Sequence, residues 1–392
     1  MTQAGNGFFG KILTRFFCLV FALASLSAFG SRQDPTQKWD GKIEIQNGVT
    51  IVENAGRPIY DGAICEFTEE LSIGKGEGSE EQLFTSVYDI DVDADGNIYI
   101  LDMRAAQVRV FDMKGRFLRS FGKKGQGPGE FQVPVYLEIS PDGRLLCFDT
   151  IAFRLTYFSK TGEFLKQILY PNIRGFRPHH VDSQGNLIGH SVLAPAPISG
   201  EILKIANAEG DRVLDVFKID SDFSRREKME FDIGKPWICY AADRSDHVYW
   251  GYSEKYEIQM IDATGKVLKI IRNRTKPVAI SAEDKIAAEK DYADVLKRGF
   301  KLAFRDAHPF FRSLSVDARN RLFVQTSEKG KGSPARYFYD IYDPEGRYLA
   351  KVLIPANIDG MSIWAGDKLY TLETDQEGYE KIVRYRVAWN LK

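Results

Sequence analysis

The feature that most constrains this chain is a repeated pair of tight turns, each followed by a short apolar strand. The clearest copies are Asp95-Gly96-Asn97 for the first turn and Lys114-Gly115 for the second. Glycine and asparagine adopt the positive φ that tight β-connections require, so both turns are typical of β-hairpins. Around them apolar and polar residues alternate with a period of two, which predicts strands near 87–93, 97–102, 107–112 and 116–121.

The same two turns recur along the chain. Later copies of the first turn lie at 141–144, 183–186, 244–247, 318–321 and 365–368, and copies of the second at 160–162, 208–210, 263–265 and 344–346. A repeat of about 45 residues with four short strands is typical of a β-propeller, because one small sheet must stack between two neighbours to bury both faces. The sequence therefore predicts an all-β fold, a six-bladed β-propeller.

The first turn occurs six times and the second only five times, so the last blade lacks a strand. A closed ring is commonly completed by a strand from the other end of the chain, here beside 381–389. Two early segments alternate suitably, 42–54 and 66–74. We favour 66–74, because it leads directly into 73–84, a looser copy of the segment that joins the first two blades.

That joining segment, FGKKGQGPGEF at 121–131, carries four glycines and two lysines, so it raises the question of phosphate binding. A P-loop requires G-x-x-x-x-G-K-[ST] between a buried strand and a helix. No such lysine and hydroxyl pair and no helical pattern follow here. We predict that the glycines serve a diagonal crossing from an outer strand to the next inner strand.

On these segments the sequence resembles NHL-repeat proteins, specifically the secreted bacterial six-bladed β-propeller proteins of that type. The residues that carry the resemblance lie at 95–99, 110–112, 115–118 and 121–131. It covers most of 66–392, strongly in the first two blades and loosely in the third and fourth. The resemblance implies the fold, and it leaves the activity open, because propellers that look like this include binding scaffolds, lyases and lactonases.

The first 30 residues are typical of a secretory signal peptide, with Lys11, Arg15, no acidic residue and an apolar run from Phe16 to Phe29. The run is shorter than the roughly 20 residues that span a bilayer, although an uncleaved anchor is the alternative. We therefore expect a signal peptide (1–30), an N-terminal extension (31–65) and a propeller (66–392). The mature protein is expected to be periplasmic or secreted, without a transmembrane segment.

Charge narrows the class of partner, and the cysteine count indicates the state of the thiols. The chain has 53 basic and 54 acidic residues, and no basic stripe, which argues against nucleic acid and leaves a protein, peptide or glycan partner. We expect a monomer. Beyond the signal segment the cysteines are Cys65, Cys147 and Cys239, which we interpret as buried single thiols, with one disulfide plus a free thiol as the alternative.

Two patterns raise the question of a metal. Asp91 to Asp102 has the acidic spacing of an EF-hand calcium loop, but it lies in alternating β-sequence without flanking helices, so we interpret it as a hairpin turn. His179, His180 and His308 precede inner strands and could face the channel, and an NHL-type lyase binds zinc with histidines there. His190 and His247 are expected at other levels. We expect no cofactor, with zinc or calcium in the channel belonging to the alternative function.

Between the fourth and fifth blades, 281–307 breaks the β-pattern. Ser281 can cap a helix whose first turn holds Glu283 and Asp284, and Gly299 can end it. An amphipathic insertion of this kind can cover one face of the ring. A lid over the channel mouth and a docking helix are the alternatives.

The funnel should be lined by the residues that begin the inner strands and by the loops between second and third strands. On that rule the candidates are Arg104, Tyr136, His179, His180, Trp237, Tyr252, Phe311 and Arg312. Aromatic and cationic groups in a concavity suit a peptide, a glycan or a small anion. The sequence thus favours an extracytoplasmic binding or scaffold protein. The alternative is a metal-dependent lyase or lactonase-type hydrolase with its site in the central channel.

Overall fold

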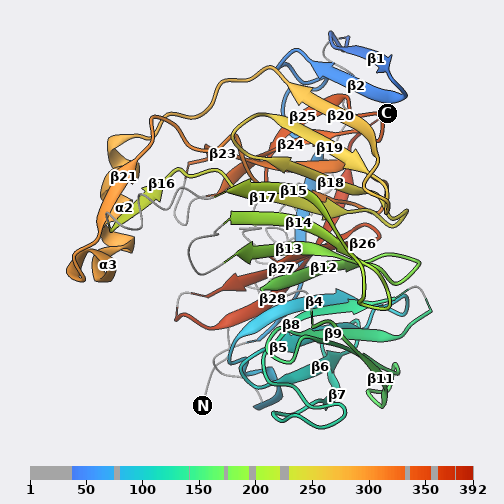
Figure 1. The fold of residues 1–392 in the computed structure, drawn as a ribbon. Coiled ribbons are helices and arrows are strands. Elements are labelled where there is room, and N and C mark those ends of the chain that lie inside the picture. Colours follow the sequence, from blue (N-terminus) through green and yellow to red (C-terminus); the bar gives the residue numbers. More distant parts are fainter. Residues whose placement is uncertain are drawn as a thin grey trace, which may run out of the picture.

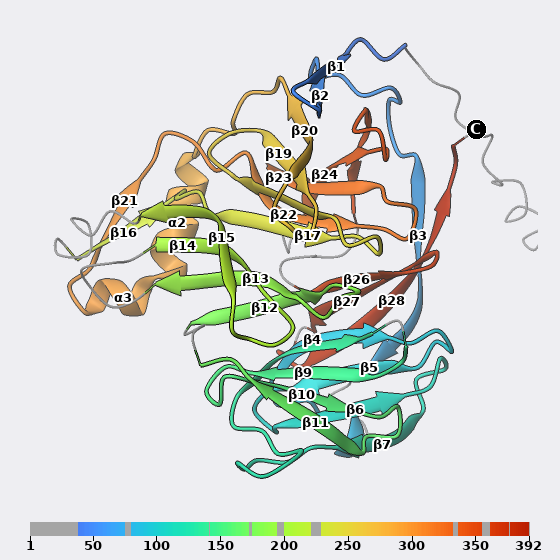
Figure 2. The ribbon, with the colours of Figure 1, turned by 45° about the vertical axis from the view of Figure 1, so that its right-hand side comes forward.

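The computed structural model describes residues 38–74, 80–140, 142–171, 175–193, 200–220, 229–331, 336–354, 361–375 and 377–391. The predicted signal peptide lies outside them. The chain forms a six-bladed β-propeller, as predicted, with six sheets that follow one another around a central channel (Figures 1 and 2). Among the described residues no helix is long and apolar enough to cross a membrane.

The first three blades are regular antiparallel sheets of four strands each, numbered from the channel outward. They consist of β4 (Val87–Val92), β5 (Ile98–Asp102), β6 (Gln107–Phe111) and β7 (Phe117–Phe121); β8 (Pro134–Ile139), β9 (Leu145–Asp149), β10 (Arg154–Phe158) and β11 (Phe164–Leu169); and β12 (Phe176–Val181), β13 (Leu187–Leu193), β14 (Gly200–Ala206) and β15 (Val213–Asp220).

The last three blades have the same order but receive additions from the N-terminal part of the chain. Their strands are β17 (Ile238–Ala242), β18 (Val248–Tyr252), β19 (Glu257–Ile261) and β20 (Val267–Asn273); β22 (Phe311–Val316), β23 (Leu322–Lys329), β24 (Tyr337–Tyr342) and β25 (Tyr348–Leu353); and β26 (Ser362–Ala365), β27 (Lys368–Thr374) and β28 (Glu380–Trp389).

The ring closes through β3 (Cys65–Ile73), which pairs antiparallel with β28 from Ile73↔Ile382 to Cys65↔Trp389. The segment 66–74 was the favoured choice for this strand, and the prediction is confirmed. The other candidate, 42–54, forms a hairpin of β1 (Lys42–Gln46) and β2 (Val49–Asn54). β2 runs parallel to β20, so the fourth blade has six strands.

Residues 42–73 thus pass along the outside of the last three blades, and we call this segment the N-terminal belt. Between β2 and β3, the amides of Ile59 and Tyr60 donate to the carbonyls of Tyr348 and Leu349 in β25, at 3.0 and 2.9 Å. The belt therefore contacts the outer strands of blades four, five and six in turn, which explains how one segment can hold half of the ring together.

The hydrophobic core lies between neighbouring blades rather than in one central cluster. Between blades one and two, for example, Leu101 and Val108 pack against Leu137 and Phe158, all nearly inaccessible to solvent. The glycine-rich segment 121–131 crosses here from β7 to β8, as predicted. At Gly122, with φ +83°, a Cβ atom would lie 2.6 Å from the Phe131 ring, so only glycine fits this close approach.

The predicted helical insertion is present between blades four and five. It contains α2 (Ala282–Asp291), α3 (Ala293–Lys297) and β21 (Lys301–Phe304), which pairs parallel with β16 (Glu230–Ile233) at one side of the propeller (Figure 1). Ser281 caps α2 in a capping box with Asp284, as its sequence indicated. Asp284 also binds His308 Nε2 at 3.1 Å and Lys329 Nζ at 2.5 Å, which fixes the helix to blade five.

Candidate functional site in the central channel

The central channel holds a cavity of about 1240 Å³. It is lined by the innermost strands and by the first turns of all six blades, from Ala94 in blade one to Gly366 in blade six. No residue of the insertion 281–307 lines it. The cavity therefore extends toward the end of the ring where the first turns lie, and the insertion does not act as its wall.

The innermost strands of four blades share an irregularity that shapes the cavity. In β4, β8, β12 and β22 the pairing with the second strand skips one residue, namely Tyr88, Val135, His179 and Arg312 respectively. Such a bulge reverses which side chains face each side of the strand beyond it. Tyr88, Val135 and His179 line the cavity as a result.

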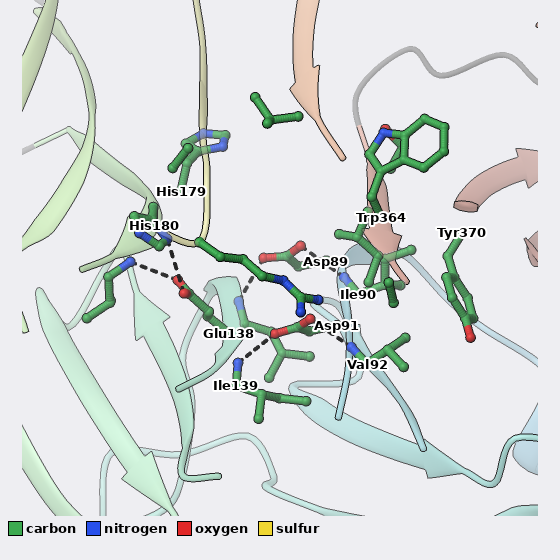
Figure 3. Close-up of a pocket in the computed structure, with 18 of the residues that line it drawn as sticks. Asp89, Ile90, Asp91, Val92, Glu138, Ile139, His179, His180, Trp364 and Tyr370 are labelled. Carbon is green, nitrogen blue, oxygen red and sulfur yellow. Dashed lines mark hydrogen bonds and ion pairs between the residues drawn. The ribbon is translucent and has the colours of Figure 1, made fainter. Parts of the chain in front are cut away.

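An acidic wall runs along blades one and two, formed by Asp89, Asp91 and Glu138 (Figure 3). An innermost strand has a free edge whose amides need acceptors. The carboxylates supply them across the gap between blades: Asp89 accepts from the Leu137 amide at 2.8 Å, Asp91 from Ile139 at 2.6 Å and Glu138 from Val181 at 2.8 Å.

The same device recurs elsewhere in the ring. Glu201 of blade three accepts from the Ile238 amide of blade four at 3.1 Å, and Glu380 of blade six accepts from the Val87 amide of blade one at 2.6 Å. These carboxylates thus join neighbouring blades. Asp89 and Asp91 differ from Glu201 and Glu380 in that they also line the cavity.

Asp89 and Asp91 are poised to exchange protons near neutral pH. Burial raises the pKa of Asp89 to about 8, although the amides of Leu137 and Ile90 favour its ionised form. Burial, with Glu138 nearby, raises the pKa of Asp91 to about 7. Carboxyl groups with strongly raised pKa values in a cavity are typical of functional sites.

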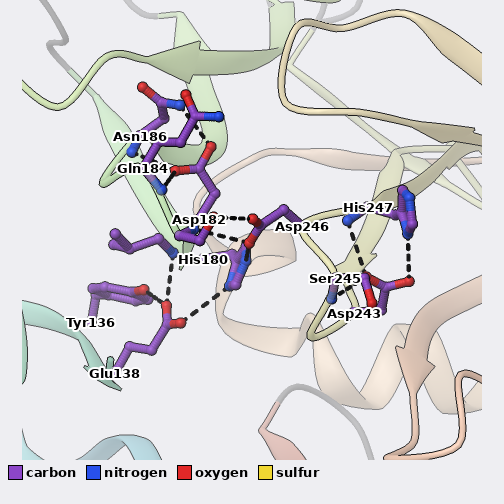
Figure 4. A network of polar contacts seen from close by, with 12 residues as sticks. Tyr136, Glu138, His180, Asp182, Gln184, Asn186, Asp243, Ser245, Asp246 and His247 are labelled. Carbon is purple, nitrogen blue, oxygen red and sulfur yellow. Dashed lines mark hydrogen bonds and ion pairs between the residues drawn. The ribbon is translucent and has the colours of Figure 1, made fainter. Parts of the chain in front are cut away.

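A polar network joins blades two, three and four beside the acidic wall (Figure 4). Its centre is His180, whose Nδ1 lies 3.2 Å from Glu138 Oε1 and whose Nε2 lies 3.7 Å from Asp246 Oδ1. The Tyr136 hydroxyl donates to Glu138, and Ser183 donates to Asp246 through its amide at 3.0 Å. Burial opposes protonation of His180, but Glu138 and Asp246 outweigh it and raise the pKa.

The pKa values of the neighbouring histidines are shifted in the opposite direction. His179 and His190 have ring centroids 5.6 Å apart, and His190 Nδ1 lies 2.7 Å from the Tyr240 hydroxyl. Burial within the ring lowers the pKa of His179 to about 3 and that of His190 to about 4, so both are neutral. Of the two, His179 lines the cavity, where its neutral imidazole can serve as a hydrogen-bond partner for a ligand.

The remaining histidines lie away from this cluster. His308 binds Asp284 of the insertion, and His247 Nδ1 lies 3.0 Å from Asp243 Oδ2 of its own turn. In the described part of the chain, no group of three or more histidine, cysteine, aspartate and glutamate side chains is arranged to hold a metal ion.

The EF-hand-like acids belong to a hairpin, as interpreted from the sequence. Asp93 accepts from the amides of Asp95 and Asn97, both at 2.9 Å, and so stabilises its own turn. Asp102 lies at the other end of β5 and accepts from the Thr85 amide at 2.8 Å. The two carboxylates thus serve separate ends of one strand pair.

Blades five and six form a largely apolar and aromatic wall of the cavity. It contains Leu314, Val316, Ile363, Trp364 and Tyr370. Figure 3 shows Trp364 and Tyr370, and Tyr370 packs in one cluster with Ile90 of blade one, because blades six and one are neighbours in the ring. The complete lining has eight acidic and four basic residues. A ligand here meets more acidic than basic residues, with the aromatic rings of blade six next to the acidic residues of blade one.

The structure brings three of the predicted funnel residues together, Tyr136, His179 and His180. The other five do not line the cavity. Arg104 is exposed in the turn after β5, and Phe311 is completely buried between blades four and five. Trp237 Nε1 donates to the Arg312 carbonyl at 3.0 Å, the Arg312 guanidinium lies over the Tyr337 ring, and Tyr252 packs against Phe217.

Sequence reasoning did not select Asp89, Asp91, Glu138 or Trp364. Apart from the EF-hand-like spacing that includes Asp91, the signal for the three acidic residues is that they occupy the polar positions of two innermost strands, in YDIDV and YLEI. That signal is the same for a strand whose polar face meets bulk water. The cysteines agree with the expectation of single thiols, since Cys65, Cys147 and Cys239 are free and buried.

Comparison with known proteins agrees with the fold, a six-bladed β-propeller. The family described as "DUF5128: 6-bladed beta-propeller" matches residues 75–173. A solved member of the DUF4221 family from Bacteroides vulgatus is similar over 83% of this chain and 99% of its own, with a TM-score of 0.53 and 10% identity. A provisionally assigned exported protein from Bacteroides fragilis is similar over 86% and 99%, with a TM-score of 0.51 and 13% identity. At these identities the likeness shows the fold alone.

Proposed function

We propose that this protein is an extracytoplasmic, non-catalytic binding propeller that holds a peptide segment with basic side chains in its central cavity. The observation that carries the proposal is the cavity itself, with eight acidic residues against four basic ones in its lining. A cleft lined by one sign of charge and bounded by low-dielectric walls concentrates ligands of the opposite sign. The proposal also includes that the protein is exported from the cytoplasm and that it is related to the NHL-repeat propellers.

The lining favours a cationic peptide over the two other ligands that the sequence suggested. A small anion would be repelled by Glu138, and also by Asp91 and Asp89 once the pH exceeds their pKa values of about 7 and 8. A neutral glycan could stack on Trp364, but it would leave the negative charge of the acidic wall uncompensated. Lysine and arginine side chains satisfy both walls, because their charged ends pair with carboxylates and also interact favourably with aromatic faces.

A second candidate is a lyase or lactonase-type hydrolase acting in the same cavity. The raised pKa values of Asp89 and Asp91 favour it, because a group that titrates near the working pH transfers protons efficiently. In that case one carboxyl would donate and the other would accept a proton. Turnover of a bound ligand would distinguish this candidate from simple binding.

Calorimetric titration with tetralysine tests the proposal at about pH 8.5, where Asp89 and Asp91 are mostly ionised, and at about 150 mM salt, which screens weak surface attraction. We expect the double variant Asp89→Asn, Asp91→Asn to bind at least about tenfold more weakly, the equivalent of about 1.4 kcal/mol. The matched control replaces Asp291 and Asp294, exposed acids of the insertion, with asparagine and should bind as the wild type does. Equal loss in both variants, or tighter binding of maltotetraose or sulfate than of tetralysine, would contradict the proposal.

A further inference from the structure

The hairpin β1–β2 presents a sheet edge at the outside of the propeller. The fourth blade ends in β1, and within the described residues no strand pairs with its other edge (Figure 2). Two isoleucines of β1 are exposed, Ile43 to 44% and Ile45 to 75%. Exposed edge strands with apolar side chains pair readily with another strand.

The geometry of the hairpin determines which backbone groups are free. The turn is Asn47-Gly48, with φ 51° and 81°, and Gln46 pairs with Val49 across it. In a two-residue hairpin these flanking residues bond to each other, and the ladder then alternates. Lys42, Glu44 and Gln46 therefore direct their amides and carbonyls toward β2, while Ile43 and Ile45 direct theirs away from it.

A second copy of β1 can meet these free groups in an antiparallel arrangement around a twofold axis. When Ile43 faces Ile43 of the other copy, Lys42 lies opposite Glu44 on both sides of the axis. Oppositely charged residues that face each other across strands are favourable. Moving the register by two residues places Glu44 opposite Glu44, which is repulsive. Of these two registers, charge therefore favours the one in which Ile43 faces Ile43.

We propose that two copies of this chain associate weakly through β1, with Ile43 facing Ile43 and Lys42 facing Glu44. β1 carries a basic and an acidic residue that can pair in this way, whereas the outer strands β7 (FLRSF) and β11 (FLKQIL) carry basic but no acidic residues. Such a twofold contact closes on itself and yields a dimer rather than a fibre. The two fourth blades then form one continuous sheet.

The contact is small, because β1 has only five residues. Weak, transient interfaces lie below about 1,200 Å² of buried surface, so the dimer forms only at high protein concentration. At low concentration the chain is a monomer, as the sequence led us to expect.

Sedimentation equilibrium over a range of protein concentrations tests the charge pattern. The variant Glu44→Lys places like charges opposite each other and should weaken association at least about tenfold. Adding Lys42→Glu restores opposite charges and should recover the association of the wild type. A wild type that stays monomeric at millimolar concentration, or a double variant as weak as the single one, would overturn the proposal.

Cysteine crosslinking tests the register independently of affinity. Opposite residues in a bonded antiparallel pair have Cα atoms about 5.5 Å apart, within the range of a disulfide. Ile43→Cys should therefore crosslink two copies on mild oxidation, whereas Ile45→Cys, which faces Gly41 in this register, should not. The wild type is the control for the native cysteines. Equal crosslinking of both variants would refute the register.

Discussion

Asn54 fastens the N-terminal belt to the ring, so its removal should destabilise the whole fold. The side chain is 1% exposed. Its Nδ2 donates to the carbonyls of Arg272 at 3.1 Å and Gly346 at 3.0 Å, and its Oδ1 accepts from the Tyr348 amide at 2.8 Å. The Asn54 side chain therefore bridges blades four and five, because Arg272 belongs to β20 and Tyr348 to β25.

Asn54→Ala should lower the free energy of unfolding, because it leaves the hydrogen-bond partners of the Asn54 side chain unpaired. The contacts to Gly346 and Tyr348 are buried, so water cannot replace the amide there. A buried polar group left without a partner costs about 1–3 kcal/mol. With two such groups, we expect the free energy of unfolding to fall by about 3 kcal/mol.

Urea unfolding followed by tryptophan fluorescence measures this change. Gln46→Ala is the matched control, because it removes an exposed amide from the same hairpin and should change stability by less than about 0.5 kcal/mol. Circular dichroism checks that both variants retain β-structure. If Asn54→Ala is as stable as Gln46→Ala, the belt does not hold blades four and five together in the way described.

Two further predictions concern the cavity and the insertion. Because Asp89 and Asp91 have pKa values of about 8 and 7, tetralysine should bind more tightly as the pH rises from 6 to 8.5 and should displace protons; equal binding heats in buffers of different ionisation enthalpy would contradict this. Both pKa values exceed the value of about 3.9 for aspartate in an unfolded chain, so the folded protein binds more protons than the unfolded chain between about pH 4 and 8. The free energy of unfolding of the wild type should therefore fall as the pH rises through this range, and that of the double asparagine variant should fall less. Ser281→Ala should destabilise α2 by about 1 kcal/mol and speed amide exchange there without affecting the blades; unchanged exchange would show that the capping box is dispensable.

The arrangement of the blades was predictable because tight turns leave a clear chemical signature. Gly96 and Gly115 adopt positive φ values of 81° and 77°, which other residues rarely adopt, so the turns recur visibly even where the strands differ. The closing strand was predictable from a count of turns. The place of the β1–β2 hairpin was not, because alternation indicates a strand but does not name its partner.

The candidate site was only partly predictable, and the bulges explain why. A period-two pattern assigns faces correctly only while the pairing stays in register. In β22 the pairing skips Arg312, so Phe311 lies between blades and not in the channel as expected. Bulges in β4 and β12 place two consecutive residues of each strand in the lining, Tyr88 with Asp89 and His179 with His180, whereas strict alternation would place only one of each pair there. No residue type marks the position of such a bulge in the sequence. The sequence therefore could not show that Asp89 and Asp91 line the cavity.

The pairing of β3 with β28 has a consequence for biosynthesis. Glu70 of β3 and Lys368 of β27, the strand beside β28, form an ion pair across 298 positions, so β3 can pair only after synthesis has passed β28. Contacts this distant in sequence form late and slowly. Until then the newly made chain carries β3 without its partner strand. A chain truncated before Glu380 would therefore leave the ring open.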